Sequence, residues 1–372
     1  MKAQVAALIM SGMLTIDQKD ANRAELDRPS ASVSADGRYV AFLTHSPLAD
    51  ADTDHSMDVY VLDRARQKVT FESPACGPID CQDPDISADG RYLVFQAEGT
   101  ILWRDTVDNV DRSLGEGRQP SVAGNGVVFF TSEHDIFSID PRGGVPRRVS
   151  IIDVPGIDTA LTWSFSPSPS ADGRYVAFSA RPPFDARRHP SSQVLVRDML
   201  LGTTRLIGRG WAPSISGDAG VLAFVGPDGG GLSHIQVADL HTGTVRIITK
   251  SVRRGLANGA SANPAISSNG RFIVFQSEAS DLVAGEDFNL LWDVFVYDRQ
   301  DGTMVRVSGD PGGAWIEPSV GPSIDATGSV IAFSSRHPTG STDERNDFDL
   351  YVAAMTRGSS QDLLTEDQKI RR

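Results

Sequence analysis

The stretch SPSADGRYVAF at residues 168–178 decides the fold, because copies of it recur along the chain. Near-identical copies are SVSADGRYVAF at 32–42, DISADGRYLVF at 85–95 and AISSNGRFIVF at 265–275. More divergent copies are SVAGNGVVFF at 121–130, SISGDAGVLAF at 214–224 and SIDATGSVIAF at 323–333. Seven copies at a spacing that suits one small sheet each predict a repeat architecture.

Each copy predicts the same four short strands. In five of the copies an Asp-Gly or Asn-Gly pair supplies the positive φ that a tight hairpin needs, and it separates a first strand from an aromatic and β-branched second strand. A third strand follows, as DVYVLDR at 58–64, DVFVYDR at 293–299 and DLYVAAM at 349–355. A glycine-containing turn then leads to a fourth strand, such as MVRVS at 304–308. We therefore predict an all-β protein, a seven-bladed β-propeller of four-stranded antiparallel blades.

The copy at residues 264–308 resembles a known repeat family. Its PAISSNGRFIVF, followed by DVFVYDRQDGTMVRVS, is similar to the repeat of the TolB-like (WD40-like) β-propeller family. The resemblance extends over roughly residues 14–365. It implies the propeller fold and says little about function, because propellers serve both as binding scaffolds and as enzymes.

The repeats predict a single propeller at residues 14–365, preceded by a segment at 1–13 and followed by a tail at 366–372. Two closures of the ring are consistent with the sequence. The last blade has a candidate fourth strand of its own at 361–365, or the segment around Leu14 pairs with the last blade. We slightly favour the second closure, in which residues 1–13 lead into a closing strand; the alternative is a weak targeting segment.

Charge and hydropathy exclude two classes of partner. Asp and Glu number 48 against 35 Lys and Arg, a net charge of −13, whereas a nucleic-acid binder needs a basic face. No apolar run approaches the roughly 20 residues that span a bilayer. We therefore expect no nucleic-acid partner and no membrane insertion, and a monomer that binds a protein or a small molecule.

Two features bear on the compartment. The amino-terminal segment shows no convincing small-x-small cleavage site, which slightly favours the cytoplasm. Cys76 and Cys81 are the only cysteines. They could close a small disulfide loop, which would favour an extracytoplasmic protein, or stay as two ordinary thiols.

The strand order sorts the loops onto two faces. The turns between first and second strands share one face with the turns between third and fourth strands, and they are short and alike. The loops between second and third strands, and those between blades, lie on the opposite face and vary in length. We call these the turn face and the loop face, and we expect ligand binding on the loop face.

Aromatic residues on the loop face are candidates for ligand binding. Trp163, Trp211 and Trp315 lie where loops enter the innermost strands, near the mouth of the central channel. Glu317 follows the last of them and is placed for acid–base chemistry there. Packing between blades is the alternative role for the tryptophans.

The fourth copy carries a basic insertion in the loop after its second strand. Arg187 and His189 belong to this run. Arginine can bind a carboxylate or a phosphate through two parallel hydrogen bonds, so we include both residues among the ligand-binding candidates. A solvated loop is the alternative.

Acidic residues gather in the loops of the first, sixth and seventh copies. The candidate metal ligands are Asp50, Asp52, Asp54, Asp58, Asp287, Asn289, Asp293, Asp343 and Asp347. Oxygen ligands at alternating positions suit Ca²⁺, and these three blades are consecutive around a closed ring. The pattern predicts a structural calcium site, and the alternative is that these residues form turns and cap strands.

An aspartate also ends the third strand in six copies. These residues are Asp63, Asp105, Asp140, Asp198, Asp239 and Asp298. Six copies of a catalytic carboxylate are not expected in one chain. We predict that they fix turns, and that the arginine of Asp-Gly-Arg is likewise a repeated structural contact.

The function predicted from these patterns is a binding scaffold that recognises a protein or small-molecule ligand on its loop face, stabilised by calcium. The alternative is an enzyme, a hydrolase, lyase or cyclase, with its site at the mouth of the central channel. No nucleophile elbow, phosphate-binding glycine loop or H-E-x-x-H motif supports a particular reaction.

Overall fold

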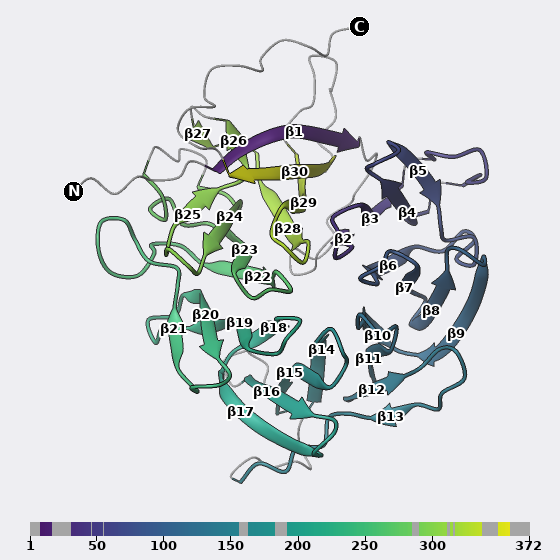
Figure 1. Cartoon of the computed structure of the whole chain (residues 1–372), viewed down its shortest axis with the longest axis horizontal. Helices are drawn as coiled ribbons and strands as arrows, with labels where there is room; N and C mark the ends of the chain where they lie inside the picture. The colour runs from purple at the N-terminus through teal and green to yellow at the C-terminus, as the bar shows by residue number, and fades with distance from the viewer. Residues whose placement is uncertain are drawn as a thin grey trace, which may run out of the picture.

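The protein is a seven-bladed β-propeller, as the sequence predicts (Figure 1). The computed structural model describes residues 8–16, 31–45, 47–54, 56–155, 163–182, 192–284, 290–310, 313–314, 317–336 and 349–357. Strands are the only regular elements in these ranges, and none of the described residues forms a helix that could cross a membrane.

Each blade has four antiparallel strands, called A to D from the central axis outward. Blade 1 contains β2 (Ala31–Val33), β3 (Tyr39–Thr44), β4 (Asp58–Asp63) and β5 (Lys68–Phe71). Blade 2 contains β6 (Cys81–Ile86), β7 (Tyr92–Ala97), β8 (Thr100–Asp105) and β9 (Val110–Glu116). Blade 3 contains β10 (Arg118–Val122), β11 (Val128–Ser132), β12 (Asp135–Ile139) and β13 (Arg147–Arg148).

The second half of the ring repeats this arrangement. Blade 4 contains β14 (Trp163–Pro169), β15 (Tyr175–Arg181), β16 (Gln193–Asp198) and β17 (Thr203–Arg209). Blade 5 contains β18 (Trp211–Ile215), β19 (Val221–Pro227), β20 (Ser233–Asp239) and β21 (Val245–Ile247). Blade 6 contains β22 (Ser261–Ile266), β23 (Phe272–Ser277), β24 (Asp293–Asp298) and β25 (Met304–Arg306). A small hairpin of β26 (Gly309–Asp310) and β27 (Gly313–Ala314) precedes blade 7.

Blade 7 joins the two ends of the chain. Its strands A to C are β28 (Ser319–Ile324), β29 (Val330–Ser335) and β30 (Asp349–Arg357), and its strand D is β1 (Leu8–Ile16). Strand β1 runs antiparallel to β30, with Leu14 opposite Val352. The first strand thus covers the edge that β30 would otherwise expose. The alternative closing segment, 361–365, lies outside the described residues.

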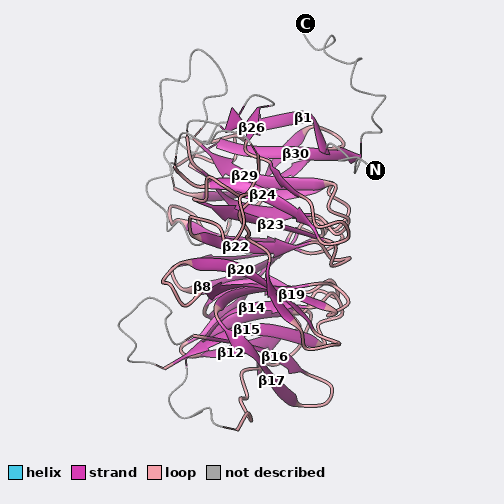
Figure 2. Ribbon diagram, turned by 90° about the vertical axis from the view of Figure 1, so that its left-hand side faces the viewer, coloured by secondary structure: helices cyan, strands magenta, loops and turns pink. Residues whose placement is uncertain are grey.

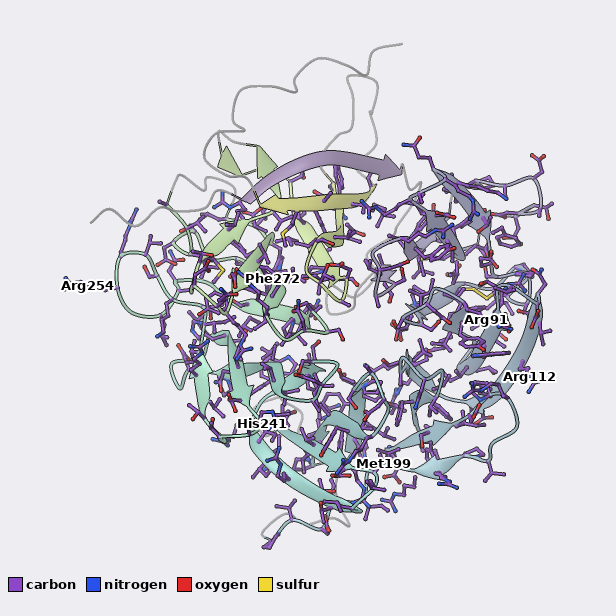
Figure 3. The ribbon with its side chains drawn as sticks, in the orientation of Figure 1. Arg91, Arg112, Met199, His241, Arg254 and Phe272 are labelled. Atoms are coloured by element: carbon purple, nitrogen blue, oxygen red, sulfur yellow. A yellow bond between two sulfur atoms is a disulfide. The ribbon has the colours of Figure 1, made fainter. Side chains whose placement is uncertain are left out.

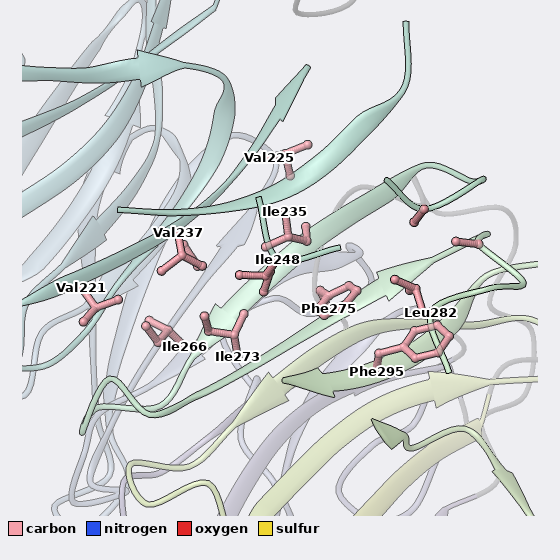
Figure 4. Close-up of a cluster of buried hydrophobic side chains, with 13 residues drawn as sticks. Val221, Val225, Ile235, Val237, Ile248, Ile266, Ile273, Phe275, Leu282 and Phe295 are labelled. Carbon is pink, nitrogen blue, oxygen red and sulfur yellow. The ribbon is translucent and has the colours of Figure 1, made fainter. Parts of the chain in front are cut away.

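The hydrophobic core is divided among the interfaces between blades. One cluster joins blades 5 and 6, where Val225 and Ile235 of one blade pack with Ile273, Phe275 and Phe295 of the next (Figure 4). Comparable clusters lie at the other junctions, including the one between blades 7 and 1. Because each blade completes the core of its neighbour, the fold depends on a closed ring.

The A–B turns show why the Ser-x-Asp-Gly-Arg-Tyr pattern recurs. In blade 1 the Ser34 hydroxyl donates to Asp36 and accepts the backbone N–H of Tyr39. The same two bonds occur in blades 2, 4, 5 and 6 around Ser87, Ser170, Ser216 and Ser267. The turn is therefore locked by local side-chain bonds, as its sequence predicts.

The arginine of this turn pairs with the aspartate that ends strand C of the same blade. Arg174 donates to Asp198 from Nε and Nη2 at 3.2 and 2.8 Å. Equivalent pairs are Arg38–Asp63, Arg91–Asp105 and Arg271–Asp298. Asp198 also accepts two backbone N–H groups of the C–D turn. The prediction that these residues are repeated structural contacts is confirmed.

Successive A–B turns are also bonded to one another around the channel. Backbone N–H groups of one turn reach carbonyls of the next, from Ala35 to Ala88, from Ala171 to Gly217 and from Asn269 to Ala326. The turn of blade 7 closes the ring, because Ala326 N donates to Ala35 O at 3.1 Å. Figure 3 shows side chains filling the spaces between blades.

Glycine is required where one blade approaches the next. Gly328 has φ +82°, and an added Cβ would overlap the ring of Phe272 in blade 6, which Figure 3 labels. Gly90 has φ +74°, and its Cβ would overlap Tyr39 of blade 1. These close contacts between neighbouring blades leave no room for a side chain at either glycine.

Removal of the closing strand should destabilise the whole ring. We expect the chain lacking residues 1–16 to unfold at a clearly lower temperature and to self-associate, because β30 becomes an exposed edge. Thermal unfolding and size-exclusion chromatography measure the two effects. An unfolding temperature equal to that of the full chain would show that β1 does not hold the ring.

Substitution of Asp198 by Asn should destabilise the protein in a pH-dependent way. Arg174 holds the pKa of Asp198 well below its ordinary value of 3.8. The pair therefore stabilises the fold fully above pH 3.8, and this stabilisation is lost as the pH falls from 3.8 toward the lowered pKa of the folded state. We expect Asp198→Asn to lower the unfolding midpoint by about 1–3 °C at pH 7, with a smaller difference at pH 3. Glu98→Gln removes an exposed carboxylate and serves as the control. A difference that does not narrow in acid would contradict the argument.

Candidate functional site

Figure 2 shows the propeller from the side, with strand connections on both of its faces. The lengths of these connections differ between the two faces. All seven A–B turns are five residues long, at 34–38, 87–91, 123–127, 170–174, 216–220, 267–271 and 325–329. On the loop face, the B–C connections have two residues in blades 2 and 3. They are much longer in blades 1, 4, 6 and 7, at 45–57, 182–192, 278–292 and 336–348. The largest differences in length between blades therefore lie on the loop face.

Three aspartates meet in the B–C loop of blade 1. Asp52, Asp54 and Asp58 each offer a carboxylate oxygen, and these oxygens lie within 4.8 Å of one another. Asp52 and Asp58 are buried, with 7% and 1% of their surface exposed. Asp50, also predicted as a ligand, is exposed and is not part of this cluster.

Hydrogen bonds hold each carboxylate of the cluster in place. The Tyr60 hydroxyl donates to Asp52 at 2.6 Å, and the Ser56 hydroxyl donates to Asp54 at 2.5 Å. Asp58 accepts the Ser73 hydroxyl at 2.7 Å. Burial raises the pKa of Asp58 to about 6; the Ser73 bond lowers it, and the nearby charges of Asp52 and Asp54 raise it.

One member of the cluster has a structural role that recurs in other blades. In blade 1, Ser73 at the end of strand D accepts Val59 N and donates to Asp58, which starts strand C. Blade 6 repeats this with Ser308 and Asp293, and blade 3 with Ser150 and Asp135. Asp58 and Asp293 therefore cap strand C, whereas Asp52 and Asp54 are specific to blade 1.

The disulfide loop between blades 1 and 2 supports the acidic loop. Cys76 and Cys81 are bonded. Within the loop, Gly77 O accepts the Ser56 hydroxyl at 3.2 Å and Asp80 accepts Met57 N at 2.8 Å. The disulfide thus braces the segment that carries Asp54 and Asp58.

The remaining predicted metal ligands cannot be joined to this cluster. Asp293 lies buried in blade 6 in its capping role. Asp287, Asn289, Asp343 and Asp347 lie outside the described residues. Of the three loops with predicted metal ligands, the structure thus describes a cluster in the loop of blade 1.

The predicted tryptophans have different surroundings. Trp211 packs against the core cluster of blades 5 and 6, which is the packing role given above as the alternative to ligand binding. Glu317 is half-buried just before β28. Trp315, Arg187 and His189 lie outside the described residues.

Trp163 lies in a cluster of aromatic and cationic side chains at the junction of blades 3 and 4. His134, in the two-residue B–C turn of blade 3, stacks on Trp163 with ring centroids 4.6 Å apart and planes 9° from parallel. The backbone fixes this approach, because Ser164 N donates to His134 O at 2.8 Å. A β-bulge follows, with Ser166 at φ 54°, so that strand A bends directly beside the rings.

Arg181 completes this cluster from the neighbouring strand. It lies opposite Trp163 in the β14–β15 register, at the loop-face end of β15. Its guanidinium lies over the rings of Trp163 and Phe165, at 5.7 and 5.6 Å from their centroids. Its Nε is buried and has no hydrogen-bond partner.

The sequence pointed to Trp163 but not to its two neighbours. Arg181 reads as the first residue of a basic loop, although it belongs to the end of a strand. His134 gave no metal-binding spacing and therefore no signal. The pairing register of strands A and B could have identified Arg181, because Trp163 and Arg181 occupy paired positions at the loop-face ends of these strands.

Comparisons with known proteins identify the fold. No protein-family model matches the sequence, and no curated protein matches it. An oligogalacturonate lyase in complex with manganese is 15% identical, with 95% of this chain and 99% of that chain covered and a TM-score of 0.57. The β-propeller domain of Cps50 (Swd1) from Myceliophteria thermophila is 11% identical, with coverages of 94% and 100% and a TM-score of 0.58.

The resemblance to the TolB-like family is also present among solved structures. TolB from Acinetobacter baumannii is 15% identical, with 86% of this chain and 81% of that chain covered and a TM-score of 0.43. At such identities the likeness concerns the fold alone. In fold, the chain is a seven-bladed β-propeller of four-stranded antiparallel blades, similar to the β-propeller domain of Cps50 (Swd1).

Proposed function

We propose that the protein is a binding scaffold that engages a protein or small-molecule ligand through its loop face. The observation that carries this proposal is the contrast between the faces. The turn face has seven turns of one length with repeated internal bonds, whereas the loop face holds the long, blade-specific connections. Variable loops on a rigid scaffold are the usual location of binding residues.

We further propose that the acidic cluster of blade 1 binds a divalent cation that orders the B–C loop. Asp52, Asp54 and Asp58 supply convergent carboxylate oxygens, which suit Ca²⁺. Hydrogen bonds from Tyr60 and Ser73 engage one oxygen of Asp52 and of Asp58 and orient these carboxylates. Such a cation would offset the repulsion among three closely spaced carboxylates and would complete the site with backbone and water oxygens.

The same surroundings bear on the compartment. The Cys76–Cys81 disulfide braces the acidic loop. Because disulfides persist in oxidising environments, it supports an extracytoplasmic location. The enzymatic alternative, with Glu317 at the channel mouth, stays a prediction and is tested by turnover.

Calcium should stabilise the protein through Asp54. We expect added Ca²⁺ to raise the free energy of unfolding, by about 2.7 kcal/mol at a hundredfold excess over the dissociation constant, because the ion binds only the folded state. Thermal unfolding with Ca²⁺ and with chelator measures the shift. Mn²⁺ is included because the lyase of the same fold was solved with that ion.

Two variants separate metal binding from strand capping. Asp54→Asn should abolish the calcium-dependent shift and leave the chelated protein as stable as before or more stable. Asp135→Ala removes the carboxylate of the equivalent strand cap in blade 3, so it should lower stability and keep the shift. A calcium shift that persists in Asp54→Asn, or no shift in the full chain, would contradict the metal site.

A further inference from the structure

Within the part of the chain that the structure describes, Arg181 shares the aromatic contacts, but not the carboxylate contact, of the arginines of the A–B turns. Four A–B-turn arginines each lie over the following aromatic ring, with the guanidinium carbon 4.8–5.3 Å from the ring centroid. These arginines are Arg38, Arg91, Arg174 and Arg271. In each, Nε and Nη2 also donate to a carboxylate of the same blade.

Arg181 has the aromatic contacts of this arrangement without the carboxylate. Its guanidinium lies over two rings instead of one. Among the described residues it makes no ion pair, and its buried Nε has no acceptor. A buried polar group without a partner is costly, so its retention calls for an explanation.

The two acidic residues that flank His134 do not supply an acceptor for Arg181. Glu133 is next to His134 but is exposed and makes no ion pair with Arg181. Asp135 is already engaged by Arg148 and Ser150. Neither of these two described carboxylates therefore pairs with the guanidinium of Arg181.

The rings around Arg181 indicate what such a molecule carries. Trp163 is half-buried and already accepts one planar ring, that of the exposed His134, in parallel stacking. Phe165 adds a second aromatic side chain under the guanidinium. A flat ring attached to the carboxylate would contact these side chains.

We propose that Arg181 binds the carboxylate of a ligand whose planar ring packs against the Trp163–His134–Phe165 cluster. The carboxylate accepts parallel hydrogen bonds from the guanidinium, as the aspartates do in the A–B turns. This proposal rests on the loop face being the binding face, and it is independent of the metal site in blade 1.

Titration calorimetry with benzoate tests the proposal. Benzoate supplies a carboxylate on a planar ring, acetate the carboxylate alone, and benzamide the ring without charge. We expect benzoate to bind at least about tenfold more tightly than either control, because each control lacks one of the two contacts. No detectable binding of benzoate, or equal binding of acetate or sulfate, would overturn the assignment.

Variants of Arg181 distinguish a binding role from a structural one. Arg181→Met should reduce benzoate affinity at least about tenfold, while the unfolding temperature stays the same or rises, because a buried Nε without an acceptor is removed. Arg181→Lys should bind more weakly than the unmodified chain, since lysine lacks the paired nitrogens. A lower unfolding temperature together with unchanged affinity in Arg181→Met would make the residue structural.

Two further variants complete the test. His134→Ala should reduce the advantage of benzoate over acetate without abolishing acetate binding. Arg253→Gln removes an exposed arginine of the loop between blades 5 and 6 and should leave benzoate binding unchanged. If benzoate binds as expected and Ca²⁺ has no effect on unfolding, the metal site fails and this site stands. If Ca²⁺ stabilises the protein and benzoate does not bind, the site at Arg181 is rejected and the metal site stands.

Discussion

The pairing of the first strand with the last blade is the constraint on which the rest of the structure depends. Strand β1 is placed beside β30 from the opposite end of the sequence, and Ala326 N bonds to Ala35 O where blade 7 meets blade 1. Each blade buries its apolar side chains against its neighbours, so an open ring would leave two unsatisfied faces as well as an exposed strand edge. Closure is therefore a condition for every interface and not a final addition to six stable ones.

Sevenfold repetition gives the molecule an internal control for assigning roles to residues. Where a contact recurs, as Arg174–Asp198 and its equivalents do, its role is to build a blade. The serine–aspartate cap of strand C recurs in the same way, which explains Asp58 without reference to a ligand. Asp52, Asp54 and Arg181 are exceptions to the repeat. Their charges are not needed by the architecture that the other blades share.

The fold was predictable because it rests on short-range chemistry repeated many times. Ser-x-Asp-Gly-Arg-Tyr specifies a turn, and the aspartate at the end of strand C specifies the partner of its arginine. The candidate sites were predictable only in part. The sequence places Asp52, Asp54 and Asp58 in one loop, but it does not show that Asp58 is held by Ser73, fifteen residues away. Nor does it show that Trp163 meets a histidine of the preceding blade, because that contact depends on how two blades pack.

The two exceptional clusters share a physical property that ordinary surface residues lack. Three carboxylates of like charge lie together in blade 1, and a guanidinium with a buried, partnerless Nε lies in blade 4. Figure 1 places blade 4 across the ring from blade 1, so neither cluster can neutralise the other. Arg104, by contrast, is a buried charge that is fully paired, because it lies between Glu72 and Asp111. These two clusters are charged groups of the loop face that the shared repeat does not explain, and they are the two places at which we propose partners of opposite charge.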